Sequence, residues 1–308
     1  MIYLKLMGRI GNQLFMYAAA RMLQENLGGN QEIVIEDYRN YGWDGYEIKY
    51  ENSLVSYDLP NVRYIHDLSI WKKPQMLIPR IVMRILTVVE GRLTPRQVYN
   101  LQRKFKKLMY SLGIVHITDG FEDLPKKQRK HYYLNGYFQS EKYFYPIKDE
   151  IIDYYSLDQE LLKIDYPNLQ KIKDRNTVCI SIKVQHNVGN PMYDVCNDGY
   201  YERAIQEIIK KVDDPLFFIC SDNVDYVLNN LVDVDKYDYV TQDASFPVHI
   251  SLAVMAKSKH FIIGNTSFGW WAQFLSRYPD KIVIAPSRWY GTDVPCDIYQ
   301  ENWHTIIV

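Results

Sequence analysis

Short apolar strands that alternate with helices restrict the fold of this chain more than any other feature. Residues 2–7 are predicted to be a buried strand and residues 8–11 a glycine turn. A helix is predicted over 12–26 because apolar residues recur there at helical spacing, and the pair Gly28–Gly29 ends it. Residues 32–36 then resume as a strand, so the chain opens with a βαβ unit.

The same alternation starts a second time near residue 177. A strand at 131–136 and a helical stretch at 140–155, interrupted at Pro146, close the first series. The second series consists of strands at 178–182, 216–220, 260–264 and 281–285 and of helices at 200–211, 251–257 and 267–276. Strands that alternate with helices are typical of doubly wound parallel sheets.

The chain is therefore predicted to be an α/β protein of two Rossmann-like doubly wound domains. Its 308 residues suit two domains of roughly 150 residues each. The N-terminal domain is expected over 1–160 and the C-terminal domain over 170–308, with a linker around 157–173. The last residues are expected to pack back on the first domain.

Residues 66–117 form an insertion of a different character within the first domain. Apolar residues alternate there with arginine and lysine, which predicts a helical hairpin with one strongly basic face. Such a face is most often simply exposed to water. The alternative is a surface for anionic lipid, or for a phosphate-bearing acceptor, and hence a peripheral contact with the inner membrane surface.

Overall composition excludes several classes of protein. The formal net charge of −1 gives no global support to nucleic-acid binding, so no nucleic-acid partner is predicted. The four cysteines are scattered, without the paired spacing of a zinc site, and are interpreted as buried thiols. The apolar N-terminus is too short for a signal peptide, and no uncharged stretch is long enough for a bilayer span, so a cytoplasmic location is the expectation.

Three loops that follow predicted strands carry residues suited to a phosphate-bearing ligand. In the first, residues 8–13, the glycines allow close backbone approach, and Arg9 and Asn12 offer donors at a helix start. The second, residues 264–271, places Thr266 and Ser267 at another helix start. The third places Asp222 after the strand at 216–220, where it can accept from a sugar hydroxyl or a purine amine. The alternatives are a plain turn and ordinary helix caps.

Four segments in order along the chain together resemble one enzyme family. They are Gly8-Arg-Ile-Gly-Asn-Gln13 with the following Leu14-Phe-Met-Tyr-Ala18, Asn135-Gly-Tyr-Phe-Gln-Ser-Glu-Lys-Tyr-Phe144, Phe217-Phe-Ile-Cys-Ser-Asp222 and Lys259-His-Phe-Ile-Ile-Gly-Asn-Thr-Ser-Phe-Gly-Trp-Trp271. They resemble the bacterial α-1,2-fucosyltransferases of glycosyltransferase family 11. The resemblance implies a GT-B-like fold with two domains facing a cleft, GDP-β-L-fucose as donor, inversion at the anomeric carbon, and neither a cofactor nor a metal.

The resemblance also implies roles for the residues of the three loops. Arg9 and Asn12 would lie near the donor diphosphate, and Asp222 would face the guanine or the ribose. Three residues would bind the diphosphate from the second domain: Thr266, Ser267 and Phe268.

One segment departs from the family pattern. The family carries a His-x-Arg-Arg-Gly-Asp motif after the strand at 178–182, and its arginine contacts the donor diphosphate. Here Lys183 replaces the histidine, Gln185 and His186 replace the arginines, and Val188 replaces the aspartate. Lys183 supplies a point charge but not the bidentate fork of arginine. The segment therefore indicates a rewired donor site, an altered donor sugar, or weak or absent catalysis.

The general base for the acceptor hydroxyl is not identified by the sequence, because Val188 cannot serve. Lys183, His186 and Asp194 are candidates for a catalytic role, and Asp37, Asp44 and Asp198 are further loop carboxylates.

The leading hypothesis is fucosyl transfer to the 2-hydroxyl of a β-galactosyl acceptor in surface polysaccharide or oligosaccharide synthesis. The alternatives are a transferase for another GDP-sugar and a non-catalytic nucleotide- or glycan-binding relative. A dinucleotide-dependent oxidoreductase ranks third, because the first glycine turn lacks its third glycine.

Overall fold

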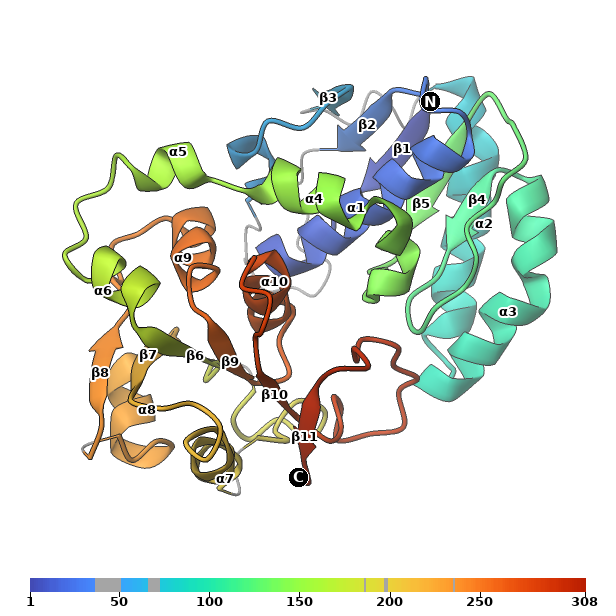
Figure 1. Ribbon diagram of the computed structural model, residues 1–308. Coiled ribbons are helices and arrows are strands. Elements are labelled where there is room, and N and C mark those ends of the chain that lie inside the picture. The colour runs from blue at the N-terminus through green and yellow to red at the C-terminus, as the bar shows by residue number, and fades with distance from the viewer. Residues whose placement is uncertain (37–50, 66–72, 186, 197–198, 235) are drawn as a thin grey trace. The chain divides into compact units, whose positions relative to one another are not determined.

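The computed structural model describes residues 1–36, 51–65, 73–185, 187–196, 199–234 and 236–308, and these form two compact units (Figure 1). Unit 1 comprises Met1–Tyr154 and Asp293–Tyr299. Unit 2 comprises Tyr155–Thr292 and Gln300–Val308.

Unit 1 is built on a parallel sheet whose strand order is β3-β2-β1-β5-β4. The strands are β1 (Ile2–Lys5), β2 (Ile33–Glu36), β3 (Val62–Ile65), β4 (Ile114–His116) and β5 (Tyr132–Asn135). The chain moves outward from β1 to β3 and then crosses to the opposite side of β1. The order therefore reverses between β1 and β5, and this is the point where open parallel sheets bind ligands.

Helices cover both faces of the unit 1 sheet because alternate strand residues point to opposite sides. α1 (Ile10–Asn26) packs on one face. On the other face, Tyr3 and Tyr133 contact apolar residues of α2 (Leu77–Glu90) and α3 (Pro95–Ser111). Two single-turn 3₁₀ helices, Glu141–Tyr143 and Tyr145–Ile147, precede α4 (Lys148–Tyr155), which confirms the interruption predicted at Pro146.

Unit 2 contains a six-stranded parallel sheet in the order β11-β10-β9-β6-β7-β8. The strands are β6 (Asn176–Ile182), β7 (Pro215–Ser221), β8 (Asp238–Thr241), β9 (His260–Ile263), β10 (Val283–Pro286) and β11 (His304–Ile306). From β6 the chain adds β7 and β8 on one side, and then crosses over and adds β9, β10 and β11 on the other. This is the strand order of the six-stranded dinucleotide-binding fold. Its reversal lies between β6 and β9.

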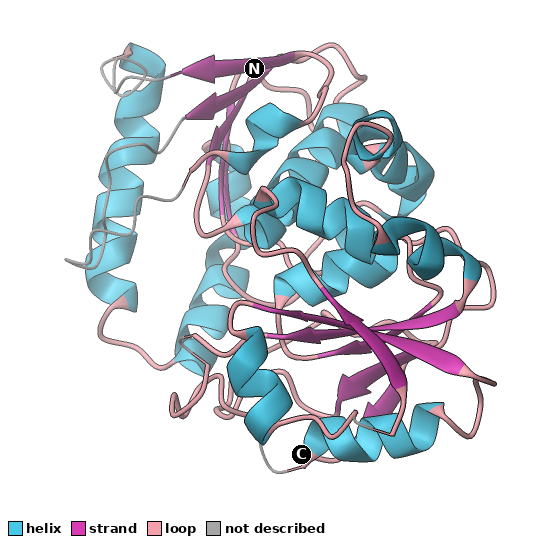
Figure 2. Ribbon diagram, turned by 90° about the vertical axis from the view of Figure 1, so that its left-hand side faces the viewer, coloured by secondary structure: helices cyan, strands magenta, loops and turns pink. Residues whose placement is uncertain are grey.

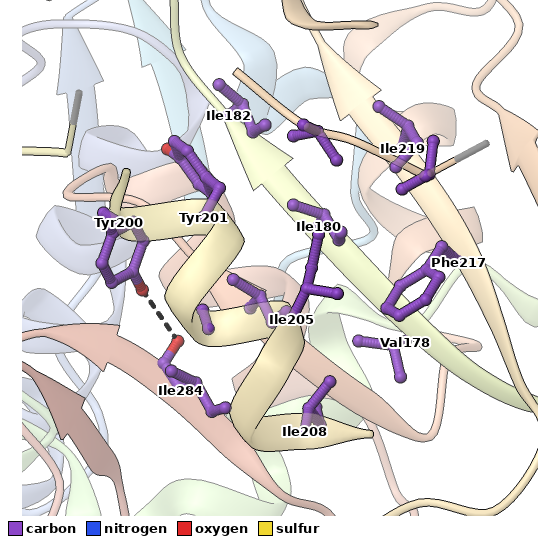
Figure 3. Close-up of a cluster of buried hydrophobic side chains, with 14 of the residues drawn as sticks. Val178, Ile180, Ile182, Tyr200, Tyr201, Ile205, Ile208, Phe217, Ile219 and Ile284 are labelled. Atoms are coloured by element: carbon purple, nitrogen blue, oxygen red, sulfur yellow. Dashed lines mark hydrogen bonds between the residues drawn. The ribbon is translucent and has the colours of Figure 1, made fainter. Parts of the chain in front are cut away.

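The helices of unit 2 also lie on both faces of its sheet (Figure 2). α7 (Tyr200–Ile208) and α8 (Val224–Asn230) pack on one face, where Ile180 and Phe217 point toward α7 (Figure 3). α9 (Val248–Met255) and α10 (Ser267–Leu275) cover the other. Two short helices, α5 (Asp158–Leu161) and α6 (Asn168–Asp174), occupy the segment that was expected to be a linker.

Two successive doubly wound parallel sheets confirm the predicted α/β, GT-B-like fold class. The prediction that helix extends to residue 117 is wrong, because Ile114–His116 is β4 and hydrogen-bonds in register with β5. The edge strands β3, β8 and β11 were also not predicted. These strands are mostly half-buried or exposed and contain charged or polar residues, so they lack the continuous apolar run by which four-residue strands such as β9 were predicted.

The cysteines behave largely as the sequence predicts. All four are free; Cys179, Cys196 and Cys220 are buried, and Cys296 is half-buried. Burial raises the pKa of Cys196 and of Cys296 to about 12, so both thiols are neutral at physiological pH. Within the described residues, no helix has the combination of length and apolarity that a bilayer crossing requires.

Candidate functional site

The carboxyl ends of β7, β6 and β9 bring most of the predicted donor-binding residues to one edge of the unit 2 sheet. Lys183 directly follows β6, Asp222 directly follows β7, and Thr266 precedes α10 shortly after β9. These three strands are neighbours, and β6 and β9 flank the reversal point. The sheet topology therefore places these residues where a nucleotide binds in folds of this class.

The Asp222 carboxylate organises the loop that departs from the family motif. It forms an ion pair with Lys183, and the side chains of both are only 22–23% exposed. It also accepts hydrogen bonds from the backbone N–H of Val184, at 2.8 Å, and of Gln185, at 3.3 Å. The ion pair fixes the lysine ammonium at the end of β6. Because backbone and lysine donors occupy Asp222, its contact with the guanine or the ribose stays a prediction.

Asn265 is a connecting residue that the sequence analysis did not single out. Its side chain is buried, and its amide nitrogen donates to the carbonyl oxygens of Tyr193, at 3.0 Å, and Trp289, at 2.9 Å. Its amide oxygen accepts from Asn187 at 3.5 Å and from the Cys196 thiol at 3.6 Å. One side chain thus holds the loop after β6 against the end of β9. The signal was its place between Gly264 and Thr266 in the most specific family segment.

Thr266 has the structural role of a helix cap, which was the alternative to ligand binding. It is the N-cap of α10, and its hydroxyl accepts from the backbone N–H of Gly269 at 3.0 Å. Ser267 and Phe268 occupy the first turn and are half-buried, whereas Trp270 and Trp271 are completely buried. The helix start directs backbone N–H groups and a partial positive charge toward the strand edge.

Two glycines allow this edge to pack closely. A Cβ on Gly264 would lie 2.5 Å from the Tyr201 hydroxyl oxygen, and one on Gly269 would lie 2.8 Å from the Ser181 hydroxyl oxygen. The Tyr200 hydroxyl donates to the carbonyl oxygen of Ile263 at 2.7 Å and to that of Ile284 at 3.3 Å; Figure 3 shows the bond to Ile284. The Tyr200 hydroxyl therefore links β9 to β10.

Only some of the candidates for a catalytic role lie within the described residues. The Asp194 carboxylate accepts from the backbone N–H of Gly189 at 2.5 Å, so it holds a turn of the loop after β6. Gln185 is exposed in the same loop. Four other candidates lie outside the described residues: His186, Asp37, Asp44 and Asp198.

The reversal point of the unit 1 sheet carries the first predicted loop. Arg9 is exposed and is the N-cap residue of α1, with no side-chain capping bond. Asn12 accepts a hydrogen bond from Gln139, 2.8 Å away in the loop after β5. The buried Gln13 donates to the carbonyl oxygens of Gly8 and Glu51, each at 2.9 Å. The sequence reasoning missed Gln139 as a partner, although both residues belong to segments that carry the family resemblance.

A buried polar cluster that was not predicted from the sequence lies beside this edge, at the ends of β4 and β5. The His116 Nε2 atom is 3.0 Å from both carboxylate oxygens of Glu90. Gln102 donates to Glu90 at 3.0 Å, and the His116 Nδ1 atom is 3.2 Å from the carbonyl oxygen of Asn135. Nearby, burial raises the pKa of Asp119. Its carboxylate accepts a hydrogen bond from the Thr118 hydroxyl at 3.0 Å.

Comparison with known families places nearly the whole chain in one family. Residues 1–307 match the sequence model described as "Glycosyl transferase family 11". The chain belongs to this family. It is therefore a glycosyltransferase, and the family predicted from its four segments is confirmed.

Two curated relatives of this family 11 glycosyltransferase come from Escherichia coli. The O-antigen biosynthesis glycosyltransferase WbnK is 22% identical, over 98% of this chain and 99% of the relative. An alpha-1,2-colitosyltransferase is 22% identical, over 93% of this chain and 91% of the relative.

Solved structures similar to this chain include two with a fucosyltransferase or a GDP complex in their description. NodZ alpha-1,6-fucosyltransferase soaked with GDP-fucose gives a TM-score of 0.46 at 13% identity, covering 89% of this chain and 91% of that one. POFUT1 in complex with GDP gives a TM-score of 0.45 at 13% identity, covering 92% of this chain and 97% of that one.

Proposed function

We propose that this glycosyltransferase transfers L-fucose from GDP-β-L-fucose to the 2-hydroxyl of a β-galactosyl acceptor. The product would enter O-antigen or another surface polysaccharide or oligosaccharide. We also propose a cytoplasmic location, with a peripheral contact to the inner membrane surface. The relative that acts in O-antigen biosynthesis supports the pathway, and family membership over the whole chain supports the reaction class.

The observation that carries this proposal is the convergence at the reversal point of the unit 2 sheet. The start of α10, with Ser267 and Phe268, and the fixed ammonium of Lys183 follow adjacent strands. When the acceptor oxygen attacks the anomeric carbon and the bond to GDP breaks, negative charge develops on the departing diphosphate. Fixed cations and amide donors stabilise that charge, and we propose that they do so without a metal.

Donor selectivity gives the most direct test. GDP and GDP-fucose are expected to raise the melting temperature, whereas UDP-sugars are not, and GDP-mannose is the matched sugar control. A ligand present at 100 times its Kd stabilises the folded protein by about 2.7 kcal/mol. A transfer assay with galactosides should then release GDP and give a fucosylated product. Equal stabilisation by UDP-sugars, or GDP binding without turnover on any galactoside, would contradict the proposal.

Transfer of a sugar other than fucose from its GDP-sugar is the second candidate function. One relative is named a colitosyltransferase, which supports a donor sugar other than fucose within the family. A GDP-sugar other than GDP-fucose that both stabilises the protein and is consumed in the transfer assay would favour this candidate.

The motif departure at Gln185 can be tested by restoring arginine. Because Lys183 and the α10 N-terminus already supply positive charge at this edge, Gln185→Arg is expected to leave kcat nearly unchanged. If the site instead lacks a donor that it needs to stabilise the diphosphate, Gln185→Arg would raise kcat on the order of 10²–10³-fold, the usual contribution of one such donor. Gln206→Arg, at an exposed position of α7, controls for the added charge. A large gain confined to Gln185→Arg would show that catalysis is impaired at this position.

A further inference from the structure

One helix of unit 1 exposes a continuous apolar row. Ile78, Ile81, Ile85 and Val88 of α2 are each 52–58% exposed. Their spacing of three, four and three residues aligns them along one side of the helix, over about 15 Å. Phe105 and Leu108 of α3 are also exposed, at 43% and 56%. These six side chains make up what we term the hairpin surface.

This apolar row is not part of the core of unit 1. The opposite side of α2 packs through Val82, Met83 and Leu86 against the sheet. α2 is therefore apolar on two sides, one that stabilises the fold and one that faces outward. Apolar patches of this kind on a folded chain mark interaction sites.

The charged residues that the hairpin segment itself carries are almost all positive. Between residues 77 and 112 the chain has eight arginine and lysine residues and a single acid, Glu90, which pairs inward with His116. Arg96 pairs with Asp293, and Arg103 and Lys106 pair with Glu122. The other five basic side chains are exposed on the two helices and the turn between them: Arg80, Arg84, Arg92, Lys104 and Lys107. On α2, Arg84 lies about 40° around the helix from Val88, which places it on the flank of the row.

We propose that the hairpin surface docks on a bilayer that contains anionic lipid. Apolar side chains enter the boundary between headgroups and acyl chains, while flanking arginine and lysine bind the lipid phosphates. A protein partner with an apolar groove would also need a strongly acidic rim, whereas an anionic bilayer supplies both features everywhere on its surface. The inference rests on the proposed function, because a membrane-bound acceptor is the reason to hold the enzyme near a bilayer.

Vesicle binding tests this directly with the full chain. The protein is expected to sediment with vesicles of phosphatidylglycerol and phosphatidylcholine and to stay in solution with vesicles of phosphatidylcholine alone. Binding should weaken as salt rises from 0.1 M toward 1 M, because the Debye length falls from about 10 Å to about 3 Å. Inorganic pyrophosphate at matched ionic strength should not release the protein; if it does, the basic residues form a discrete phosphate site instead.

Two combined variants separate the charge from the apolar row. Arg84→Glu with Lys104→Glu and Lys107→Glu should weaken binding to anionic vesicles by at least about 100-fold, at about fivefold for each basic residue lost. Its control reverses three exposed lysines elsewhere, Lys126, Lys127 and Lys211, and should bind like the wild type.

The apolar variant, Ile81→Ser with Ile85→Ser, should also lose vesicle binding. Its control is Leu162→Ser with Ile307→Ser, which removes two exposed apolar side chains outside the hairpin. Because all of these positions are exposed, the melting temperature should remain close to that of the wild type.

Transfer to a water-soluble galactoside separates this inference from the proposed function. Both hairpin variants should keep that activity while they lose vesicle binding. A wild type that ignores anionic vesicles, or variants that bind as tightly as their controls, would overturn the docking inference and leave the transfer reaction intact. A wild-type dimer that Ile81→Ser with Ile85→Ser converts to a monomer would also overturn it, since the row would then be a contact between copies.

Discussion

Replacing Gly136 by alanine is expected to destabilise unit 1 by at least about 4 kcal/mol, which is exceptional for a single substitution. Gly136 directly follows β5, and a Cβ on it would lie 1.8 Å from the carbonyl oxygen of Ile117. That contact is with backbone, and the backbone N–H of Ile117 also donates to Asn135 at 3.1 Å. The end of β4 therefore cannot move away without breaking its pairing with β5. Chemical unfolding followed by circular dichroism measures the loss.

A matched glycine in the same unit serves as the control for Gly136→Ala. Gly28 also has a positive φ, of 87°, but a Cβ there would meet only the flexible Gln128 side chain, at 3.6 Å. Gly28→Ala should cost only the strain of the left-handed backbone, about 1–2 kcal/mol. If both variants unfolded at the same denaturant concentration, the close approach at Gly136 would not be what makes that position require glycine.

The Glu90–His116 pair gives the second large expected effect. Glu90 is the last residue of α2, where the helix dipole disfavours a carboxylate, and its side chain is only 13% exposed. Glu90→Ala would leave Gln102 and His116 without their shared partner. A buried polar group left without its partner costs about 1–3 kcal/mol, so with two such groups denaturant unfolding should show a loss on the order of 3 kcal/mol. Glu301→Ala, at an exposed position, is the control.

The contribution of the Glu90–His116 pair to stability should depend on pH. Burial acts against the charged form of Glu90, but the hydrogen bond and charge of His116 outweigh it and hold the pKa below its usual value. The stabilisation is therefore fully present above the unfolded-state pKa, about 4.3, and is lost as the pH falls toward the lowered value. The stability difference between the wild type and Glu90→Gln should shrink as the pH drops from neutral through this range. A difference that did not change with pH would exclude this linkage.

Features repeated over many residues could be predicted from the sequence. The apolar runs that became β6, β7 and β9 were recognised because the strands are buried on both faces of the sheet. The helix start at Thr266 and Ser267 was recognised because a cap residue comes shortly after a strand. These two local signals place the candidate donor-binding residues at one sheet edge.

Contacts between residues distant in sequence could not be predicted in this way. Glu90 and His116 are 26 residues apart, and Asn12 and Gln139 are 127 residues apart. Nothing in the neighbouring residues of either partner indicates that the two will meet. Only the strand order, with β5 inserted between β1 and β4, brings these loops to one edge. A single sequence does not encode that order as a local pattern.

The short segment Asp293–Tyr299 limits how this enzyme can be divided. It belongs to unit 1, although the chain on both sides of it belongs to unit 2. Within it, Asp297 accepts from the backbone N–H of Phe121 at 2.8 Å and from Lys142 at 3.0 Å. A fragment truncated after Tyr154 would lack both interactions. An isolated N-terminal half would therefore need this seven-residue piece grafted onto it to retain its native contacts.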